Sequence, residues 1–114
     1  MIDVYGLGNC DTCRKALKWL VKNNLEHRFH DFRRDGLDRQ KLGRWIAAGG
    51  LETLLNRRST TWRGLADTDK DAIDGAKAAA LMAAHPALIK RPVFEATGRV
   101  IVGFKDEQKK LLAG

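Results

Sequence analysis

The chain has 114 residues, of which 44% are hydrophobic and 31% are charged. This composition is typical of a folded domain and excludes a disordered tail. No apolar stretch approaches the roughly 20 residues that cross a bilayer, and no signal peptide is visible at the N-terminus. We therefore expect a cytoplasmic protein without a membrane partner, folded as one domain over residues 1–114.

The charge balance favours anionic partners. Lysine and arginine number 21 against 14 aspartates and glutamates, which gives a net charge of +7. The excess is spread along the chain and forms no basic arm. We therefore expect a solvated basic surface and no direct contact with nucleic acid, with nucleic acid or another acidic partner as the alternative interpretation.

The N-terminal third of the chain predicts a β-α-β unit. Residues 2–5 alternate in polarity and are followed by Gly6 and Gly8, as expected of a strand that enters a loop. Apolar residues at helical spacing then predict a helix from Cys13 to the asparagine pair at residues 23–24. Residues 27–32 are predicted to form a second strand, parallel to the first and joined to it by a right-handed crossover.

The middle of the chain predicts helices. Asp38 is a candidate N-cap for a helix that ends at the glycine pair at residues 49–50, and a short helical turn follows over residues 51–55. Residues 56–61 are predicted to be a polar loop. The alanine-rich residues 71–84 predict a third helix, which ends near Pro86.

Two strands and a helix are predicted at the C-terminal end. Residues 92–95 and 99–102 have the pattern of a β-hairpin, and Asp106 is a candidate cap for a last helix. The order β-α-β, helices, β-β-α, with Cys-x-x-Cys at the first strand-to-helix junction, predicts an α/β thioredoxin-like fold with a central helical insertion. In such folds a cis proline faces the cysteine loop, and Pro92 after Arg91 is placed to supply it.

The two cysteines of the chain, Cys10 and Cys13, lie at this junction. A sulfur at a helix start lies among unsatisfied backbone N–H groups and at the positive end of the helix dipole, which favours the thiolate. A cysteine three residues later lies within disulfide range. We therefore expect Cys10 to be a nucleophile, and Cys13 to be either a resolving cysteine or a buried apolar side chain.

A zinc site is the alternative use of these cysteines, because His27 and His30 follow them at a spacing near that of a zinc finger. Residues three apart on a strand face opposite sides, so the two histidines do not converge. We therefore expect no metal site.

Several separated segments carry a resemblance to a known family. The chain resembles the ArsC/Spx superfamily over its whole length, and most closely the YffB branch, whose members are described as arsenate-reductase-like. The matching segments are Tyr5-Gly6, Asn9-Cys10-Asp11-Thr12, Lys15-Ala16-Leu17-Lys18-Trp19-Leu20, Arg28-Phe29-His30-Asp31, Asp35-Gly36-Leu37-Asp38, Leu54-Leu55-Asn56, Thr60-Thr61-Trp62-Arg63, Ile89-Lys90-Arg91-Pro92 and Gly103-Phe104.

The resemblance implies roles for particular residues. Cys10 matches the family's nucleophilic cysteine, and Arg91 matches an arginine that helps bind the oxyanion in arsenate reductases. Arg58 matches a second such arginine, with Arg57 as its alternative. Two guanidinium groups beside a thiolate would stabilise the sulfur anion and receive an anionic substrate. The expected substrate-binding residues are Asn9, Thr12, Arg58, Arg91 and Pro92.

The resemblance implies a glutathione-dependent thiol-disulfide oxidoreductase without a tightly bound cofactor. Glutathione would be the co-substrate, a glutathionylated or oxidised molecule the substrate, and glutaredoxin an optional partner. Arsenate is disfavoured as the substrate, because arsenate reductases have a histidine where this chain has Gly6 and an arginine near the position of Gly103.

An Spx-type transcriptional regulator is the competing interpretation. Spx proteins carry Cys-x-x-Cys with the spacing of Cys10 and Cys13, use it as a redox switch, and bind the α subunit of RNA polymerase near a glycine. Gly50 precedes Arg58 by eight residues, as in Spx. Glycine also occurs there in YffB relatives, so this position discriminates poorly between the two branches.

Overall fold

The computed structural model describes residues 1–113. They divide into two compact units, one made of residues 1–36 with residues 91–113 and the other of residues 37–90. We call the first the sheet unit and the second the helical unit. The expectation of one domain over the chain stays a prediction.

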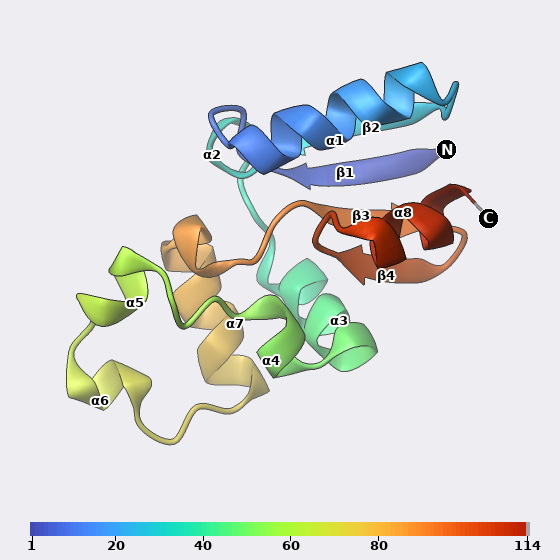
Figure 1. Ribbon diagram of the computed structural model, residues 1–114. Helices are drawn as coiled ribbons and strands as arrows, with labels where there is room; N and C mark the ends of the chain where they lie inside the picture. The colour runs from blue at the N-terminus through green and yellow to red at the C-terminus, as the bar shows by residue number, and fades with distance from the viewer. Residues whose placement is uncertain (114) are drawn as a thin grey trace. The chain divides into compact units, whose positions relative to one another are not determined.

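The sheet unit has four strands in the order β2-β1-β3-β4 (Figure 1). β1 (Ile2–Gly6) pairs in parallel with β2 (His27–Asp31) and antiparallel with β3 (Val93–Ala96), which continues into β4 (Arg99–Val102). α1 (Asp11–Lys22) makes the crossover from β1 to β2. This is the thioredoxin-like arrangement that the sequence predicts, and the helical unit is the insertion between its two halves.

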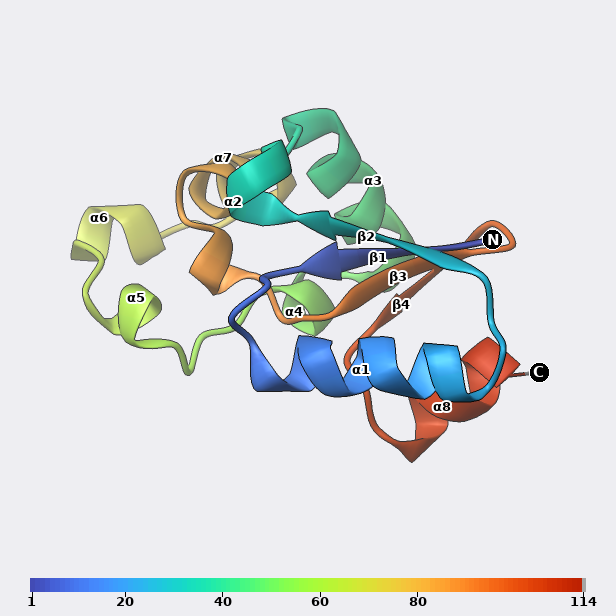
Figure 2. The same ribbon diagram turned by 90° about the horizontal axis from the view of Figure 1, so that it is seen from above.

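One face of the sheet packs against helices. α1 lies across this face because its apolar residues recur at helical spacing, and α8 (Asp106–Ala113) lies on the same side (Figure 2). Burying a leucine-sized side chain contributes about 1.5–3 kcal/mol, so this core fixes α1 on the sheet. The cluster consists of Ile2, Val4, Ala16, Leu20, Phe94, Ile101 and Leu112.

The helical unit is built on α3 (Arg39–Gly49) and α7 (Gly75–Ala84), which pack side by side (Figure 2). Leu42 and Trp45 of α3 are buried, as is Met82 of α7. The shorter elements are α4 (Leu51–Leu54), α5 (Thr60–Arg63), α6 (Asp67–Lys70) and η1 (Pro86–Leu88). No helix among residues 1–113 is both long and apolar enough to span a bilayer.

The second strand ends earlier than predicted, because a side-chain cap starts a helix there. Asp31 closes β2, because its carboxylate accepts hydrogen bonds from the backbone N–H groups of Arg33 and Arg34 at 2.8 and 3.2 Å. These bonds start α2 (Phe32–Asp35), so the strand is one residue shorter than predicted and Phe32 is helical.

Side-chain caps also explain two differences from the predicted elements. The differences concern the predicted loop over residues 56–61 and the predicted helix over residues 71–84. α5 begins within that loop, because Ser59 Oγ accepts from the Trp62 N–H at 3.1 Å. α7 begins only at Gly75, because Asp74 caps it through the Lys77 N–H at 2.8 Å. α6, which the sequence pattern does not indicate, lies between them.

Smaller shifts affect three other ends. α1 begins at Asp11 and not at Cys13, and β3 begins one residue after Pro92. Asp106 lies inside the first turn of α8 and does not precede it. Such shifts of one or two residues are common at the ends of elements.

Candidate redox site

Cys10 is the N-cap residue of α1. Its backbone is extended, with φ −96° and ψ 123°, and its N–H donates to the Leu7 carbonyl at 3.1 Å. The Cys10 carbonyl accepts from the Arg14 N–H at 3.0 Å, which is the first bond of the helix. The half-buried Cys10 side chain therefore lies at the positive end of the helix dipole, as predicted.

Cys13 and Arg91 both lower the pKa of the Cys10 thiol. Burial raises the pKa of this thiol, but hydrogen bonds from the Cys13 backbone N–H, the Cys13 thiol and the Arg91 guanidinium lower it, helped by the positive charge of Arg91. The donors outweigh burial, so the pKa of Cys10 lies below its ordinary value. The site therefore favours a thiolate at Cys10.

Cys13 has the opposite electrostatic environment. Its side chain is 1% exposed, and burial raises the pKa of its thiol to about 12, although the Leu7 backbone N–H acts against this. Its interaction with the Cys10 sulfur raises the pKa further. Both cysteines are free, and at neutral pH Cys13 remains a thiol that donates its proton toward Cys10.

Gly6 provides the space for the Cys13 sulfur. A Cβ atom at Gly6 would overlap Cys13 Sγ, because the sulfur lies directly against the Gly6 backbone. Any side chain at this position, including the histidine of arsenate reductases, is therefore incompatible with the observed position of Cys13. At Gly103 a positive φ of 95° likewise disfavours the arginine of those enzymes.

Arg91 interacts with the cysteine pair, and Pro92 follows it in the chain. The peptide bond between them is cis, Pro92 is fully buried, and Arg91 contacts the Cys10 sulfur. Asn9 and Thr12 flank Cys10 in the chain and are exposed, one in the turn before α1 and the other in its first turn. Their roles in substrate binding stay predictions.

The two other candidate arginines lie in the helical unit. Arg57 forms a bidentate ion pair with Glu52 at 3.0 and 2.5 Å, and its guanidinium lies 5.0 Å from the centre of the Trp62 ring. Arg58 is held only through its backbone N–H, by Asn56 Oδ1 at 3.1 Å, and it forms no ion pair within the described residues. Arg58 is therefore the better candidate of the two, and its role stays a prediction.

The histidines of the zinc interpretation have other partners. His30 Nε2 lies 2.9 Å from Asp3 Oδ1, and the His30 ring stacks on Tyr5 with centroids 4.6 Å apart. His27 Nδ1 lies 2.8 Å from the Leu25 carbonyl. Across residues 1–113 no three His, Cys, Asp or Glu side chains gather as metal ligands would.

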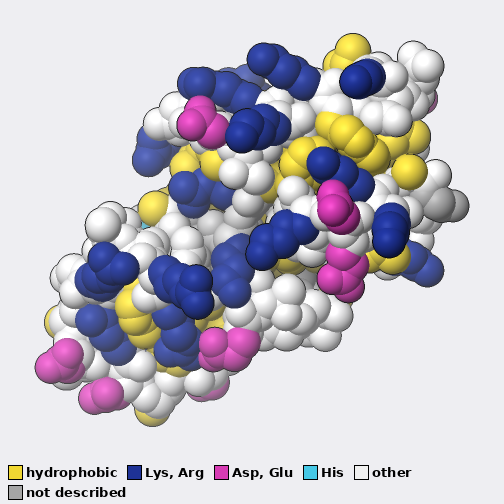
Figure 3. Space-filling model, in the orientation of Figure 1, with side chains coloured by type: hydrophobic (Ala, Val, Ile, Leu, Met, Phe, Trp, Pro, Cys, Tyr) yellow, Lys and Arg dark blue, Asp and Glu magenta, His cyan; other side chains and the backbone are white. Residues whose placement is uncertain are grey.

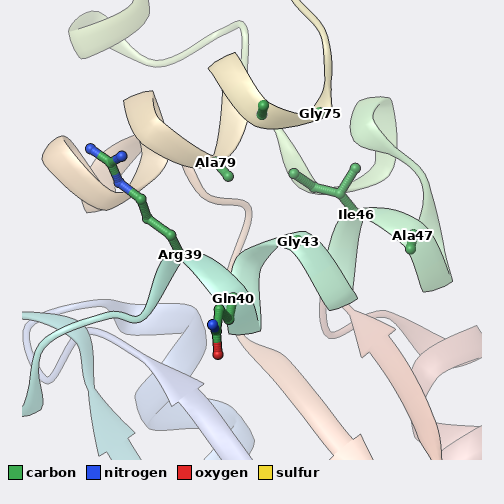
Figure 4. Close-up of a pocket in the computed structure, with 8 residues that line it drawn as sticks. Arg39, Gln40, Gly43, Ile46, Ala47, Gly75 and Ala79 are labelled. Carbon is green, nitrogen blue, oxygen red and sulfur yellow. The ribbon is translucent and has the colours of Figure 1, made fainter.

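A separate cavity of about 520 Å³ lies between α3 and α7 of the helical unit (Figure 4). Its walls are mostly small or apolar, including Gly43, Ile46 and Ala79, and Arg39 is its one charged lining residue. It contains no nucleophile or general base, so it is not a redox site.

Two side chains that the sequence pattern does not single out, Asp31 and Arg14, hold the loop before Cys10. Asp31 Oδ2 accepts from the Gly8 N–H at 2.8 Å, and Arg14 Nε donates to the Gly8 carbonyl at 3.1 Å. The available signal was an aspartate at the end of a strand, where such residues commonly cap the next helix.

Comparisons with known proteins identify the family of the chain. The family model described as ArsC family matches residues 5–111. An uncharacterized protein of Haemophilus influenzae is 45% identical over 108 residues, covering 95% of each chain. The solved structure of a protein named YffB superposes with a TM-score of 0.94 at 43% identity, covering 100% of both chains.

A more distant group of relatives consists of regulators. The global transcriptional regulator Spx of Streptococcus pyogenes serotype M3 is 27% identical over 110 residues, covering 95% of this chain and 81% of its own. The match of the family model covers nearly the whole chain. The chain belongs to the ArsC family.

Proposed function

We propose that this protein is a glutathione-dependent thiol-disulfide oxidoreductase of the arsenate-reductase-like family, with Cys10 as its nucleophile. The observation that carries the proposal is the position of Cys10 at the N-cap of α1, where Cys13 and Arg91 lower the pKa of its thiol. A thiolate at neutral pH is the species that attacks a disulfide. We place this chemistry in the cytoplasm, where glutathione is abundant.

The first step is attack by the Cys10 thiolate on the glutathione sulfur of a glutathionylated substrate. A bond forms between Cys10 Sγ and that sulfur, the substrate disulfide breaks, and the substrate leaves as a thiolate that takes a proton from solvent. Glutathione thiolate then attacks the mixed disulfide at Cys10. Oxidised glutathione leaves, and the Cys10 thiolate is restored.

Glutathione is a better resolving thiol than Cys13 in this scheme. A Cys13 pKa of about 12 leaves little thiolate at neutral pH. Burial, the largest cause of that high pKa, remains when Cys10 is in a mixed disulfide. Cys13 then acts mainly as a hydrogen-bond donor to Cys10, and an internal disulfide is the slower route.

The charge around Cys10 suits an anionic thiol such as glutathione. Arg91 lowers the pKa of the Cys10 thiol, and dark blue basic side chains are scattered over the region of α1 in Figure 3. Lys15, Lys18 and Lys22 are exposed on this helix. A positive surface of this kind raises the local concentration of anions near the nucleophile. Arg58 is proposed as a second contact for the substrate carboxylates.

Arsenate is a poorer substrate for this site. The positions of the histidine and the third arginine of arsenate reductases are occupied by Gly6 and Gly103. A side chain at Gly6 would displace the Cys13 sulfur, and the positive φ of Gly103 disfavours one there. Losing one charge-assisted hydrogen bond to an oxyanion costs about 1.5–3 kcal/mol.

A redox-controlled regulator is the second candidate, favoured by the hydrogen bond between Cys10 and Cys13 and by the similarity to Spx. In this case formation of the internal disulfide would control binding to the α subunit of RNA polymerase. A pull-down of the α subunit with oxidised and reduced protein tests it, and absence of binding in both states removes it.

The proposed enzyme is tested by the glutathione-linked reduction of a glutathionylated peptide, with Cys10→Ser and Cys13→Ser compared in the same assay. We expect Cys10→Ser to reduce turnover to the uncatalysed rate and Cys13→Ser to retain turnover within about tenfold of the unmodified protein. Full turnover by Cys10→Ser would exclude Cys10 as the nucleophile. Loss of turnover in Cys13→Ser alone would instead support the internal disulfide.

A further inference from the structure

We propose that Asp31 is the positioning residue of the nucleophile, because its carboxylate holds the loop that presents Cys10. This inference rests on the proposed function of Cys10. Asp31 does not contact the sulfur, and it acts on the backbone of Gly8, two residues before the cysteine.

Both backbone polar groups of Gly8, its N–H and its carbonyl, are hydrogen-bonded to side chains. Its N–H donates to Asp31 Oδ2 at 2.8 Å, and its carbonyl accepts from Arg14 Nε at 3.1 Å. A Cβ atom at Gly8 would lie 3.1 Å from Asp31 Oδ2, which is tighter than ordinary van der Waals contact. The loop therefore passes close to the carboxylate, with its neighbouring backbone groups fixed by β2 at one side and α1 at the other.

The second oxygen of Asp31 is bound elsewhere. Asp31 Oδ1 accepts from the N–H groups of Arg33 and Arg34, which caps α2. The Asp31 N–H itself donates to Asp35 Oδ2 at 2.9 Å, and Asp35 forms a bidentate pair with Arg34 at 3.0 and 2.9 Å. The carboxylate thus accepts three backbone N–H bonds, two on Oδ1 and one from Gly8 on Oδ2.

We call the hydrogen bond between the Gly8 N–H and the Asp31 carboxylate the clamp. Gly8 lies only two residues before Cys10 along the loop. Leu7 is 3% exposed, and its carbonyl accepts from the Cys10 N–H. Gly8 and Asn9 form the intervening turn. Releasing Gly8 allows this turn to move, and the Cys10 sulfur then loses its alignment with the donors on Cys13 and Arg91.

Positioning and simple charge repulsion predict opposite results. If Asp31 only repelled the nearby thiolate, removing its charge would make Cys10 more reactive. If Asp31 positions the loop, loss of its hydrogen bond to the Gly8 N–H makes Cys10 less reactive. A variant that keeps the cap of α2 separates the clamp from helix stability.

Asp31→Ser is that variant, because serine caps helices as aspartate does but is too short to reach Gly8 as well. Asp31→Asn has the same shape with one acceptor oxygen and no charge. Asp38→Ser is the matched control, since Asp38 caps α3 through the Gln40 N–H at 2.9 Å and belongs to the helical unit.

The readout is the rate of iodoacetamide alkylation at Cys10 against pH, resolved by peptide mass spectrometry, with circular dichroism to confirm folding. We expect Asp31→Ser to slow alkylation at neutral pH about fivefold and to move the midpoint of the profile upward, with Asp31→Asn between it and the unmodified protein. Asp38→Ser should leave the profile unchanged.

Two results would overturn the inference: an Asp31→Ser profile equal to or faster than that of the unmodified protein, or an equal slowing by Asp38→Ser. If Asp31→Ser does not fold, Asp31→Asn decides in the same way. If the unmodified protein itself alkylates like a free thiol, the proposed function of Cys10 fails. That result is distinct from failure of the clamp, which requires an activated Cys10 that Asp31 does not affect.

Discussion

The sheet unit and the helical unit use polar residues in different ways. In the sheet unit Asp31 caps α2 and also binds the Gly8 N–H, two residues before Cys10, while Arg91 lowers the pKa of the Cys10 thiol. In the helical unit Asp38 and Asp74 cap helices, each through a backbone N–H two or three residues ahead. In the described residues, an aspartate of the helical unit binds only the helix that it caps, whereas Asp31 also reaches a loop that is distant in sequence.

The largest expected effect comes from the sheet core. Phe94 is fully buried, so Phe94→Ala should lower the free energy of unfolding by about 3–5 kcal/mol. Peptide-resolved hydrogen exchange in denaturant should show the helical unit losing protection together with the sheet unit, as one domain requires. Protection that persists in the helical unit would divide the chain into two domains. Leu111→Ala, at a leucine that is 45% exposed, is the control.

Arg91→Gln tests the contact between a guanidinium and the nucleophile. A hydrogen bond to a charged group contributes about 1.5–3 kcal/mol, so we expect Cys10 alkylation at neutral pH to slow by about ten- to a hundredfold. Arg57→Gln is the matched control in the helical unit, because Arg57 is bound to Glu52. Equal slowing in both variants would show that net charge, and not the contact, activates Cys10.

Gly6→Ala tests the close approach of Cys13. The new Cβ overlaps Cys13 Sγ, so overpacking should destabilise the protein by about 1–3 kcal/mol. Adding Cys13→Ala should restore stability, because the remaining contact with the Cys13 Cβ is an ordinary 3.6 Å. Gly43→Ala in α3 meets nothing within 4 Å and should be neutral or slightly stabilising. If Gly6→Ala and Cys13→Ala instead lower the thermal midpoint additively, the close approach of the Cys13 sulfur to Gly6 is contradicted.

Acid should weaken the sheet unit through Asp31. Burial raises the pKa of this carboxyl, but hydrogen bonds from Gly8, Arg33 and Arg34 outweigh it and hold the pKa below its ordinary value. Because the folded pKa is lower than the unfolded pKa of about 3.9, the stabilisation is complete above that value and is lost as the pH falls through the folded pKa.

The expected size is small, because the carboxylate is partly exposed and solvent screens it. The unmodified protein should lose stability between about pH 5 and pH 2, and Asp31→Asn should make this loss smaller by about 0.5 kcal/mol. The measurement compares the thermal midpoints of the two proteins at the two pH values. Asp67→Asn, at an exposed carboxylate of α6, is the comparison. An acid profile of Asp31→Asn that superposes on that of the unmodified protein would contradict the lowered pKa.

Sequence patterns predicted the sheet unit well, because local signals and topology agree there. The Cys-x-x-Cys pair marked the start of α1, and the position of Pro92 before a hairpin indicated its cis bond, which the structure confirms. The parallel pairing of β1 with β2 follows from their single helical connection.

The helical unit was less predictable because side-chain caps decide its boundaries. Ser59 and Asp74 start α5 and α7 inside segments whose composition indicates a loop or a longer helix. The clamp of Asp31 on Gly8 spans 23 residues, and no local pattern specifies such a contact. The space that Gly6 leaves for Cys13 is likewise visible only in three dimensions.

The most direct test of the central claim is peptide-resolved alkylation of both cysteines in the unmodified protein from acidic to alkaline pH. We predict that Cys10 reacts with a midpoint below the ordinary cysteine value of about 8.5, and that Cys13 remains protected until the pH is far higher. A midpoint for Cys10 at or above the ordinary value, or equal reactivity of the two cysteines, would contradict the account.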